Sequence, residues 1–318
     1  MGVQVKRAKP GVILAAIVFV LGVSDRAWAW GPAMHVGIAD SVLAHLAILP
    51  AALAALLRHH RVDYLFGNVA ADVVFAKRWS RIKQFCHHWS TAFCLLDDAE
   101  DDRARAFAYG YLSHLAADTV AHGKYVPRQV VVSGCSVNYG HFYWELRADA
   151  LQSRWTRRRL RRVLLADHSR HHQALSCLIT DTFLPYSLNR ILFDRMQGLA
   201  AQPTLQGPLD AWNRHSRWRM SSELLDDYRA ECLQRVFAVL TEGARSAVTH
   251  EDPNGTSTLM QLQVRRREFR RLRREGLPVT RRVAEVARGF DPIVGMQPGE
   301  GRLPPRTPAD TRLAVAAG

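Results

Sequence analysis

The sequence contains no Cys-x-x-Cys pair, although it has five cysteines. This absence argues against a thiolate zinc site of the zinc-finger kind. In an exported protein the cysteines could form one or two disulfides, or most of them could be small buried apolar residues. The sequence alone leaves both alternatives open for Cys86, Cys94, Cys135, Cys177 and Cys232.

Acidic residues are scarce, with 29 Asp and Glu against 43 Lys and Arg, and the formal net charge is +14. Such an excess of positive charge favours anionic partners, namely phospholipid head groups, nucleic acid or an acidic envelope surface, without choosing among them. A hydrophobic share of 48% excludes a largely disordered chain and indicates a globular protein.

Long apolar runs are also missing. The longest, residues 11–23, falls short of the roughly 20 residues that span a bilayer. Basic residues precede it and the small-x-small sequence Ala27-Trp28-Ala29 follows, which predicts a secretory signal peptide over residues 1–29, cleaved after Ala29. An uncleaved membrane anchor is the alternative. Cleavage would make the protein secreted or periplasmic and would free the α-amino group of Trp30, which can bind a metal once deprotonated.

Strand-like alternation is rare, and there is no internal repeat. Apolar residues instead recur at helical spacing over 35–60, 98–122, 141–165, 171–200, 221–248 and 259–288, which predicts an all-α fold. Acidic residues between 97 and 102 suit the start of the second of these helices, and Gly123 is expected to end it. The stretch 125–133 is expected to be a loop between helices.

Two basic stretches and a histidine cluster stand out. Residues 154–165 bury one apolar face, so their arginines should form a solvated face. Residues 264–276 form either a surface helix for anionic partners or an exposed arm. The histidines of "HSRHH", 168–172, are expected to be solvated. We expect one helical domain over 30–250, then a basic helix and a Pro/Gly-rich, disordered tail over 251–318.

Three side chains that can bind metal lie along one side of a predicted helix. His114, Asp118 and His122 are four residues apart, and each step of four turns the side chain by only about 40°. The rest of this helix is apolar, so these polar groups would be costly to bury without a partner. A bound metal ion would supply that partner.

Further candidates lie nearby. His141 and Glu145 are four residues apart on another predicted helix, a pair that carries little weight by itself. Asp72 lies in an apolar stretch, where it is either a ligand or a helix cap. One member of the His87–His88 pair should face inward, and His35 follows Trp30 by five residues. Imidazole and carboxylate ligands without thiolate suit zinc in an open, catalytic site, and their number indicates two or three ions.

In order and spacing, these residues resemble the zinc-dependent phospholipase C family, whose superfamily also includes the single-strand-specific zinc nucleases. The resemblance covers residues 30–145 and implies an all-α bundle with a metal cluster in a central cleft. His88 is chosen over His87 because an aromatic residue, Trp89, follows it. The ligands that the resemblance implies are Trp30, His35, Asp72, His88, His114, Asp118, His122, His141 and Glu145.

The resemblance implies three Zn²⁺ ions. Trp30, His35 and Asp118 would hold one. Asp72, His88, His114 and the bridging Asp118 would hold another. His122, His141 and Glu145 would hold the third. In the bacterial phospholipases and the nucleases, the histidine after the bridging Asp comes six residues later, whereas here it comes four later, so the third site is expected to be shifted.

The implied activity is phosphodiester hydrolysis by a metal-bound hydroxide, with Asp72 orienting or deprotonating the attacking water. A phospholipase C would split phospholipids into diacylglycerol and a phosphorylated head group, with an anionic membrane as a further partner. The alternatives are a zinc-dependent nuclease acting on single strands and a non-catalytic envelope protein stabilised by zinc.

Overall fold

The computed structural model describes residues 30–73, 85–179, 184–200 and 220–293, together with residues 207, 211 and 213–218. Every regular element in these residues is a helix, so the all-α prediction is confirmed. None of the helices found there is both long and apolar enough to cross a membrane. The predicted signal peptide and the Pro/Gly-rich tail beyond residue 293 lie outside the described residues.

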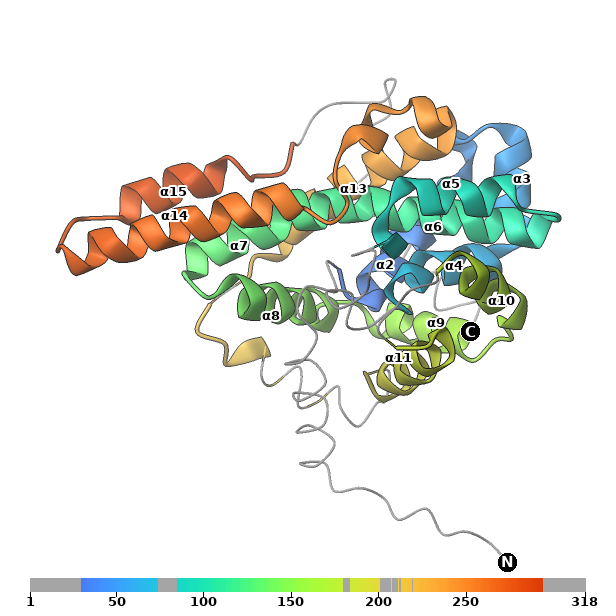
Figure 1. Ribbon diagram of the computed structural model, residues 1–318, viewed down its shortest axis with the longest axis horizontal. Coiled ribbons are helices and arrows are strands. Elements are labelled where there is room, and N and C mark those ends of the chain that lie inside the picture. Colours follow the sequence, from blue (N-terminus) through green and yellow to red (C-terminus); the bar gives the residue numbers. More distant parts are fainter. Residues whose placement is uncertain are drawn as a thin grey trace, which may run out of the picture.

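The elements follow one another from blue to red in Figure 1. The α-helices are α2 (Pro32–Ala44), α3 (Ala51–His59), α4 (Arg61–Ala70), α5 (Trp89–Asp97), α6 (Asp102–Val120), α7 (Val126–Ser133), α8 (Val137–Ala150), α9 (Arg154–Leu164), α10 (Ser169–Leu178), α11 (Tyr186–Ala200), α13 (Ser222–Glu242), α14 (Thr256–Arg274) and α15 (Thr280–Arg288). Short helical turns are η1 (Leu46–Ile48), η2 (Ala71–Val73), η4 (Phe85–His87), η5 (Ala121–Tyr125), η6 (Gly243–Arg245) and η7 (Ala247–His250).

Helix α6 forms the centre of the bundle. Its N-cap residue, Asp101, accepts a hydrogen bond from the Ala104 N–H at 2.9 Å, as the acidic stretch before it predicts. From Ala106 onward almost all of its side chains are buried, against α4, α5 and α13. Figure 1 shows these helices and α2 gathered around it. A helix buried on all sides can place polar groups deep in the core only if they find partners.

Glycines allow α4 and α6 to cross at very short range. A Cβ atom on Gly67 would lie 2.1 Å from the Phe107 carbonyl oxygen, and one on Gly110 would lie 2.1 Å from that of Tyr64. Side chains at these positions would force the helices apart. This contact fixes the end of α4, and with it Asp72 in η2, against the middle of α6.

The helix after residue 98 does not end at Gly123, and the prediction of a loop over 125–133 is wrong. The chain continues from α6 through η5, a π-helical turn, directly into α7. Pro127, the second residue of α7, comes directly after this π-helical turn, which interrupts the regular i→i−4 hydrogen bonds. The helix ends at Gly134, which adopts the left-handed conformation with φ of 66°.

Four of the six arginines of α9 are exposed, and Arg157 and Arg159 are half-buried. The prediction for the "HSRHH" histidines is wrong, because all three are buried. His168 stacks on Phe66 with ring centroids 3.7 Å apart. His171 Nε2 lies 2.7 Å from an oxygen of Asp63, and His172 bonds to the hydroxyl of Tyr186 at 2.9 Å. The partners of these histidines lie on other helices, and the contacts with them take the place of solvent.

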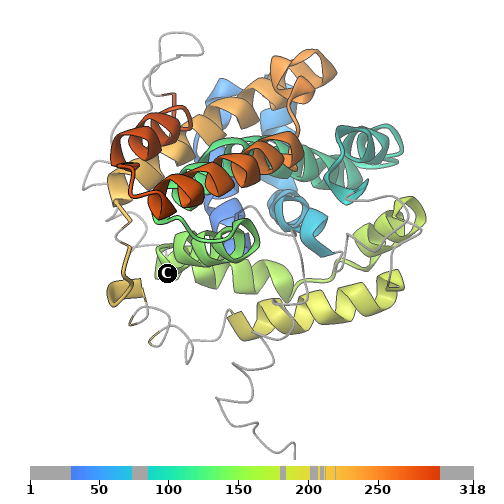
Figure 2. The same ribbon diagram turned by 60° about the vertical axis from the view of Figure 1, so that its left-hand side comes forward.

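Helices α14 and α15 lie side by side along α7, at the left of Figure 1, and the turned view in Figure 2 agrees. Phe269 and Leu272 of α14 are buried, so the basic stretch 264–276 is a packed surface helix. The boundary drawn at residue 250 stays a prediction. All five cysteines lie in the described residues, and none of them forms a disulfide there.

Candidate metal centre

Asp118 lies at the centre of a buried group of histidines. Its Oδ1 is 3.2 Å from Nε2 of His35, and its Oδ2 is 3.2 Å from Nε2 of His114 and 3.3 Å from Nε2 of His87. His87 Nε2 also lies 3.3 Å from Oδ1 of Asp72. All five side chains are buried. Four separate elements, α2, η2, η4 and α6, therefore bring nitrogen and oxygen donors to one place.

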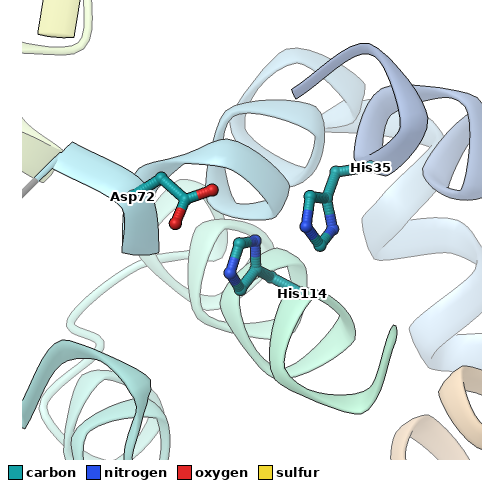
Figure 3. A group of neighbouring side chains, drawn as sticks. All are labelled: His35, Asp72 and His114. Carbon is teal, nitrogen blue, oxygen red and sulfur yellow. The ribbon is translucent and has the colours of Figure 1, made fainter. Parts of the chain in front are cut away.

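Figure 3 shows His35 from α2, Asp72 from η2 and His114 from α6 directed toward one another. The His35 and His114 rings are stacked with centroids 4.0 Å apart. Nδ1 of His114 lies 2.9 Å from the Asn68 carbonyl oxygen, to which it donates a hydrogen bond. That bond fixes the tautomer, so Nε2 turns its lone pair toward the cluster, as in a metal-binding histidine.

The third predicted group also comes together. His141 Nε2 lies 2.7 Å from Oε1 of Glu145 on α8, and the rings of His122 and His141 are 4.7 Å apart. His122 Nε2 is 3.9 Å from Oδ2 of Asp118. His122 lies in the π-helical turn η5, which widens the helix at the point where its ring meets α8. The two groups thus adjoin each other through Asp118.

Trp30 is anchored beside the same cluster. Its indole Nε1 donates to the Ala117 carbonyl oxygen at 3.3 Å, and its ring stacks on Tyr125 with centroids 4.4 Å apart. Ala117 is the residue before Asp118. The side chain therefore holds the backbone at residue 30 close to the centre of the site.

The geometry favours His87 over His88 as the candidate ligand. His87, in η4, is buried and contacts Asp72, His114 and Asp118, whereas His88 is exposed at the N-cap of α5. Trp89, the aromatic residue after His88, donates its indole N–H to the Glu251 carbonyl oxygen at 2.9 Å. The 3-10 turn η4 sets which ring faces inward, so His87 takes the place of His88 in the set of candidate ligands.

The residues present fit zinc ions. Nδ1 of His35 and Nδ1 of His122 are buried, and neither has a hydrogen-bond partner among the described residues. The Asp118 oxygens approach the imidazole nitrogens at 3.2–3.3 Å without hydrogen-bond geometry. Burial, and then the neighbouring His114, lowers the pKa of His35. Burial, followed by His141, lowers the pKa of His122 well below its usual range. Neutral imidazoles with free lone pairs are the form that binds zinc.

Asp118 remains ionised in the same place. Burial raises its pKa, but the contacts with His114 and then His35 and His87 outweigh this and hold the pKa well below the usual value. A buried carboxylate surrounded by imidazoles is therefore available to bridge cations.

A loop from the C-terminal part of the chain holds two of these ligands in place. Nδ2 of Asn254 donates to the His87 carbonyl oxygen at 3.1 Å, across 167 residues of sequence. A Cβ on Gly255 would lie 2.6 Å from the His122 carbonyl oxygen. Nothing in the local sequence indicates these contacts, and neither residue was among the predicted site residues.

Asp149, also absent from the sequence prediction, ties α8 to the start of α2. Its Oδ1 accepts from the Met34 N–H at 2.8 Å, and its Oδ2 accepts from the Ala33 N–H at 3.2 Å. The carboxylate thus satisfies two N–H groups in the first turn of α2. This contact positions the segment that carries Trp30 and His35 against the helix that carries His141.

We expect Asp149→Asn to remove a pH dependence of stability. Burial raises the pKa of Asp149 to about 7, despite its hydrogen bonds to α2. Because the unfolded value is about 3.9, the native state holds the extra proton, so the free energy of unfolding should fall as the pH rises from about 4 to about 7 and level off above.

Asparagine resembles the protonated acid, so the wild type should lose up to about 4 kcal/mol relative to Asp149→Asn across this range. Urea unfolding of both metal-free proteins at a series of pH values measures the difference. The titration of the metal ligands is common to the two proteins and cancels. Parallel stability curves would contradict the assignment.

Comparison with known proteins bears on this cluster. A family model described as zinc dependent phospholipase C matches residues 34–186. The searches of curated proteins and of solved structures returned no match. The matched segment contains all the side chains of the buried cluster and its neighbouring group, namely His35, Asp72, His87, His114, Asp118, His122, His141 and Glu145. Residues 34–186 therefore belong to the zinc-dependent phospholipase C family, and the chain that carries them is a phospholipase C-like hydrolase of phosphodiesters.

Proposed function

We propose that this protein is an exported phospholipase C that hydrolyses phospholipids to diacylglycerol and a phosphorylated head group. The observation that supports it most directly is the convergence of buried histidines and carboxylates on Asp118, within the segment that the family model matches. Export rests on the predicted signal peptide, whose removal after Ala29 would free the amine of Trp30.

We further propose three zinc ions, in two adjoining groups. His35, Asp72, His87, His114 and Asp118, with the backbone of Trp30, would hold two of them, and His122, His141 and Glu145 would hold the third. When bound, zinc acts as a Lewis acid that lowers the pKa of a coordinated water and neutralises charge on the phosphate. The shared carboxylate of Asp118 keeps the two groups at a fixed separation.

Asp72 is the chain's candidate for orienting the attacking water and accepting its proton. It lies in η2 at the end of α4, where the Gly67–Gly110 crossing fixes the backbone. One of its oxygens, Oδ1, is near His87 Nε2 at 3.3 Å. Burial keeps bulk water from competing for it, and the surrounding helices hold its position before substrate arrives.

The decisive experiment compares two phosphodiester substrates on the zinc-loaded protein. We expect release of phosphocholine and diacylglycerol from phosphatidylcholine, loss of this activity with a chelator and recovery with Zn²⁺. N-terminal sequencing of the exported protein should begin at Trp30.

Three outcomes would count against the proposal. Acid-soluble nucleotides released from single-stranded DNA, without phosphocholine, would make the protein a nuclease. Bound zinc without turnover of either substrate would favour a zinc-stabilised envelope protein. A leader still attached in the exported protein would contradict the cleavage but not the hydrolysis.

A further inference from the structure

One side of α14 carries a row of arginines beside α7. Arg266, Arg270 and Arg273 are spaced by four and three residues, so they follow one another along a single side of the helix. They line a shallow hollow with Val131 and Gly134 at the end of α7. The Nε atom of Arg266 donates to the Gly134 carbonyl oxygen at 3.3 Å. We call these three residues the arginine row.

The acids of α14 lie elsewhere on the helix. Glu268 lies 3.3 Å from Arg265, and Glu275, at the C-cap, lies 3.6 Å from Arg271. Glu268 and Glu275 are seven residues apart, on a line roughly half a turn from the arginine row. In the part of the chain that the structure describes, no acidic side chain forms an ion pair with the row. The helix therefore separates neutralised arginines from arginines whose charge is available.

The arginines of the row also repel one another. Burial, and then the nearby Arg270, lowers the pKa of Arg266 from its usual value. An anion placed between these guanidinium groups would relieve that repulsion, and guanidinium is well suited to bind phosphate oxygens.

The turn after the row is apolar and exposed. Helix α14 ends at Arg274, and Gly276, with φ of 73°, reverses the chain toward α15. Leu277 follows, with 49% of its surface exposed, and Pro278 is exposed beside it. Figure 1 shows this turn at the far left end of the paired helices, beyond the rest of the bundle. A cationic side that ends in a protruding apolar tip suits the boundary between lipid head groups and acyl chains.

We propose that the arginine row and Leu277 form a docking surface for an anionic phospholipid bilayer. The segment 256–293 carries ten arginines and four acids, so it is attracted as a whole to a negative surface. The row supplies the contacts with phosphate, and Leu277 supplies apolar burial at the interface. This surface lies outside the family-matched segment and does not depend on the hydrolytic reaction.

The test compares two double variants that remove the same charge. Arg270→Gln/Arg273→Gln changes two exposed arginines of the row, and Arg265→Gln/Arg271→Gln changes two arginines that are already paired. Binding is measured by co-sedimentation of the full-length, zinc-loaded protein with vesicles of equimolar phosphatidylcholine and phosphatidylglycerol, after brief contact in the cold.

We expect the row variant to lose at least about tenfold in partitioning and the paired variant to lose much less, since each arginine at an anionic surface contributes on its own. Raised salt should weaken wild-type binding. Arg270→Lys/Arg273→Lys should retain binding. Equal losses in the two double variants, or none in either, would overturn the proposal.

Leu277→Ser separates a bilayer from a nucleic acid. We expect it to weaken vesicle binding by several-fold, because a leucine loses apolar burial, and to leave retention of a single-stranded oligonucleotide unchanged. Tighter binding to the oligonucleotide than to the vesicles, with no effect of Leu277→Ser on either, would replace the membrane with nucleic acid. Leu277→Ser also decides the matter if circular dichroism shows that the arginine variant does not fold.

Discussion

Asp118→Asn should lower the rate of phosphodiester hydrolysis by about a thousandfold, the upper end of the range for removal of one electrostatic group from an active site. The Asp118 carboxylate contacts His35, His87 and His114. It also lies 3.9 Å from Nε2 of His122, which belongs to the adjoining group. An amide places an N–H donor where a cation should bind, and it carries no charge to neutralise one. Zinc content should fall with the rate, as elemental analysis of the purified variant would measure.

Asp63→Asn is the matched control. Asp63 is also a buried aspartate in contact with a histidine, His171, and it is paired with Arg103, but it lies outside the metal cluster. Removing its charge should cost about 1–3 kcal/mol of stability, because buried partners lose a hydrogen-bonded acceptor, and should leave turnover and zinc content unchanged. Similar losses of activity in the two variants would show that Asp118 acts only through stability.

The two adjacent histidines should respond in opposite ways. His87→Gln should lower the rate by about a hundredfold or more, because the imidazole between Asp72, His114 and Asp118 is removed from the buried cluster. His88→Gln should stay within about twofold of the wild type, as expected of an exposed position. Steady-state rates and zinc stoichiometry of both variants check this directly.

A large loss in His88→Gln with an active His87→Gln would restore the sequence-based choice and contradict the placement of η4. Loss in both variants would indicate that the turn, and not one ring, is required. Thermal unfolding of each variant separates a lost ligand from a misfolded chain.

Contacts within one helix were the part of the site that the sequence could predict. The steps of four from His114 to Asp118 and from Asp118 to His122 follow from helical geometry, and so does the step from His141 to Glu145. The apolar spacing likewise predicted an all-α fold, which is confirmed.

Features that depend on other elements were not predictable. The direction of the His87 side chain depends on the 3-10 turn η4, and no sequence pattern indicates how such a turn orients its residues. The helix continues past Gly123 in a π-helical turn instead of ending there. The sequence predicted solvated histidines at 168–172, because the partner of His171 is Asp63, which lies more than a hundred residues away in the sequence. Asp149 and Asn254 act through contacts of 115 residues or more.

The loop at 251–255 has a consequence for how much of the chain a working hydrolase needs. Its Asn254 supports the backbone of His87, and its Gly255 lies against that of His122, yet both come well after the family-matched segment ends at residue 186. A fragment trimmed to that segment would keep nearly every ligand and lose the scaffold behind two of them. Catalytic competence is therefore a property of the longer chain, and expression boundaries chosen from the family match alone would be too short.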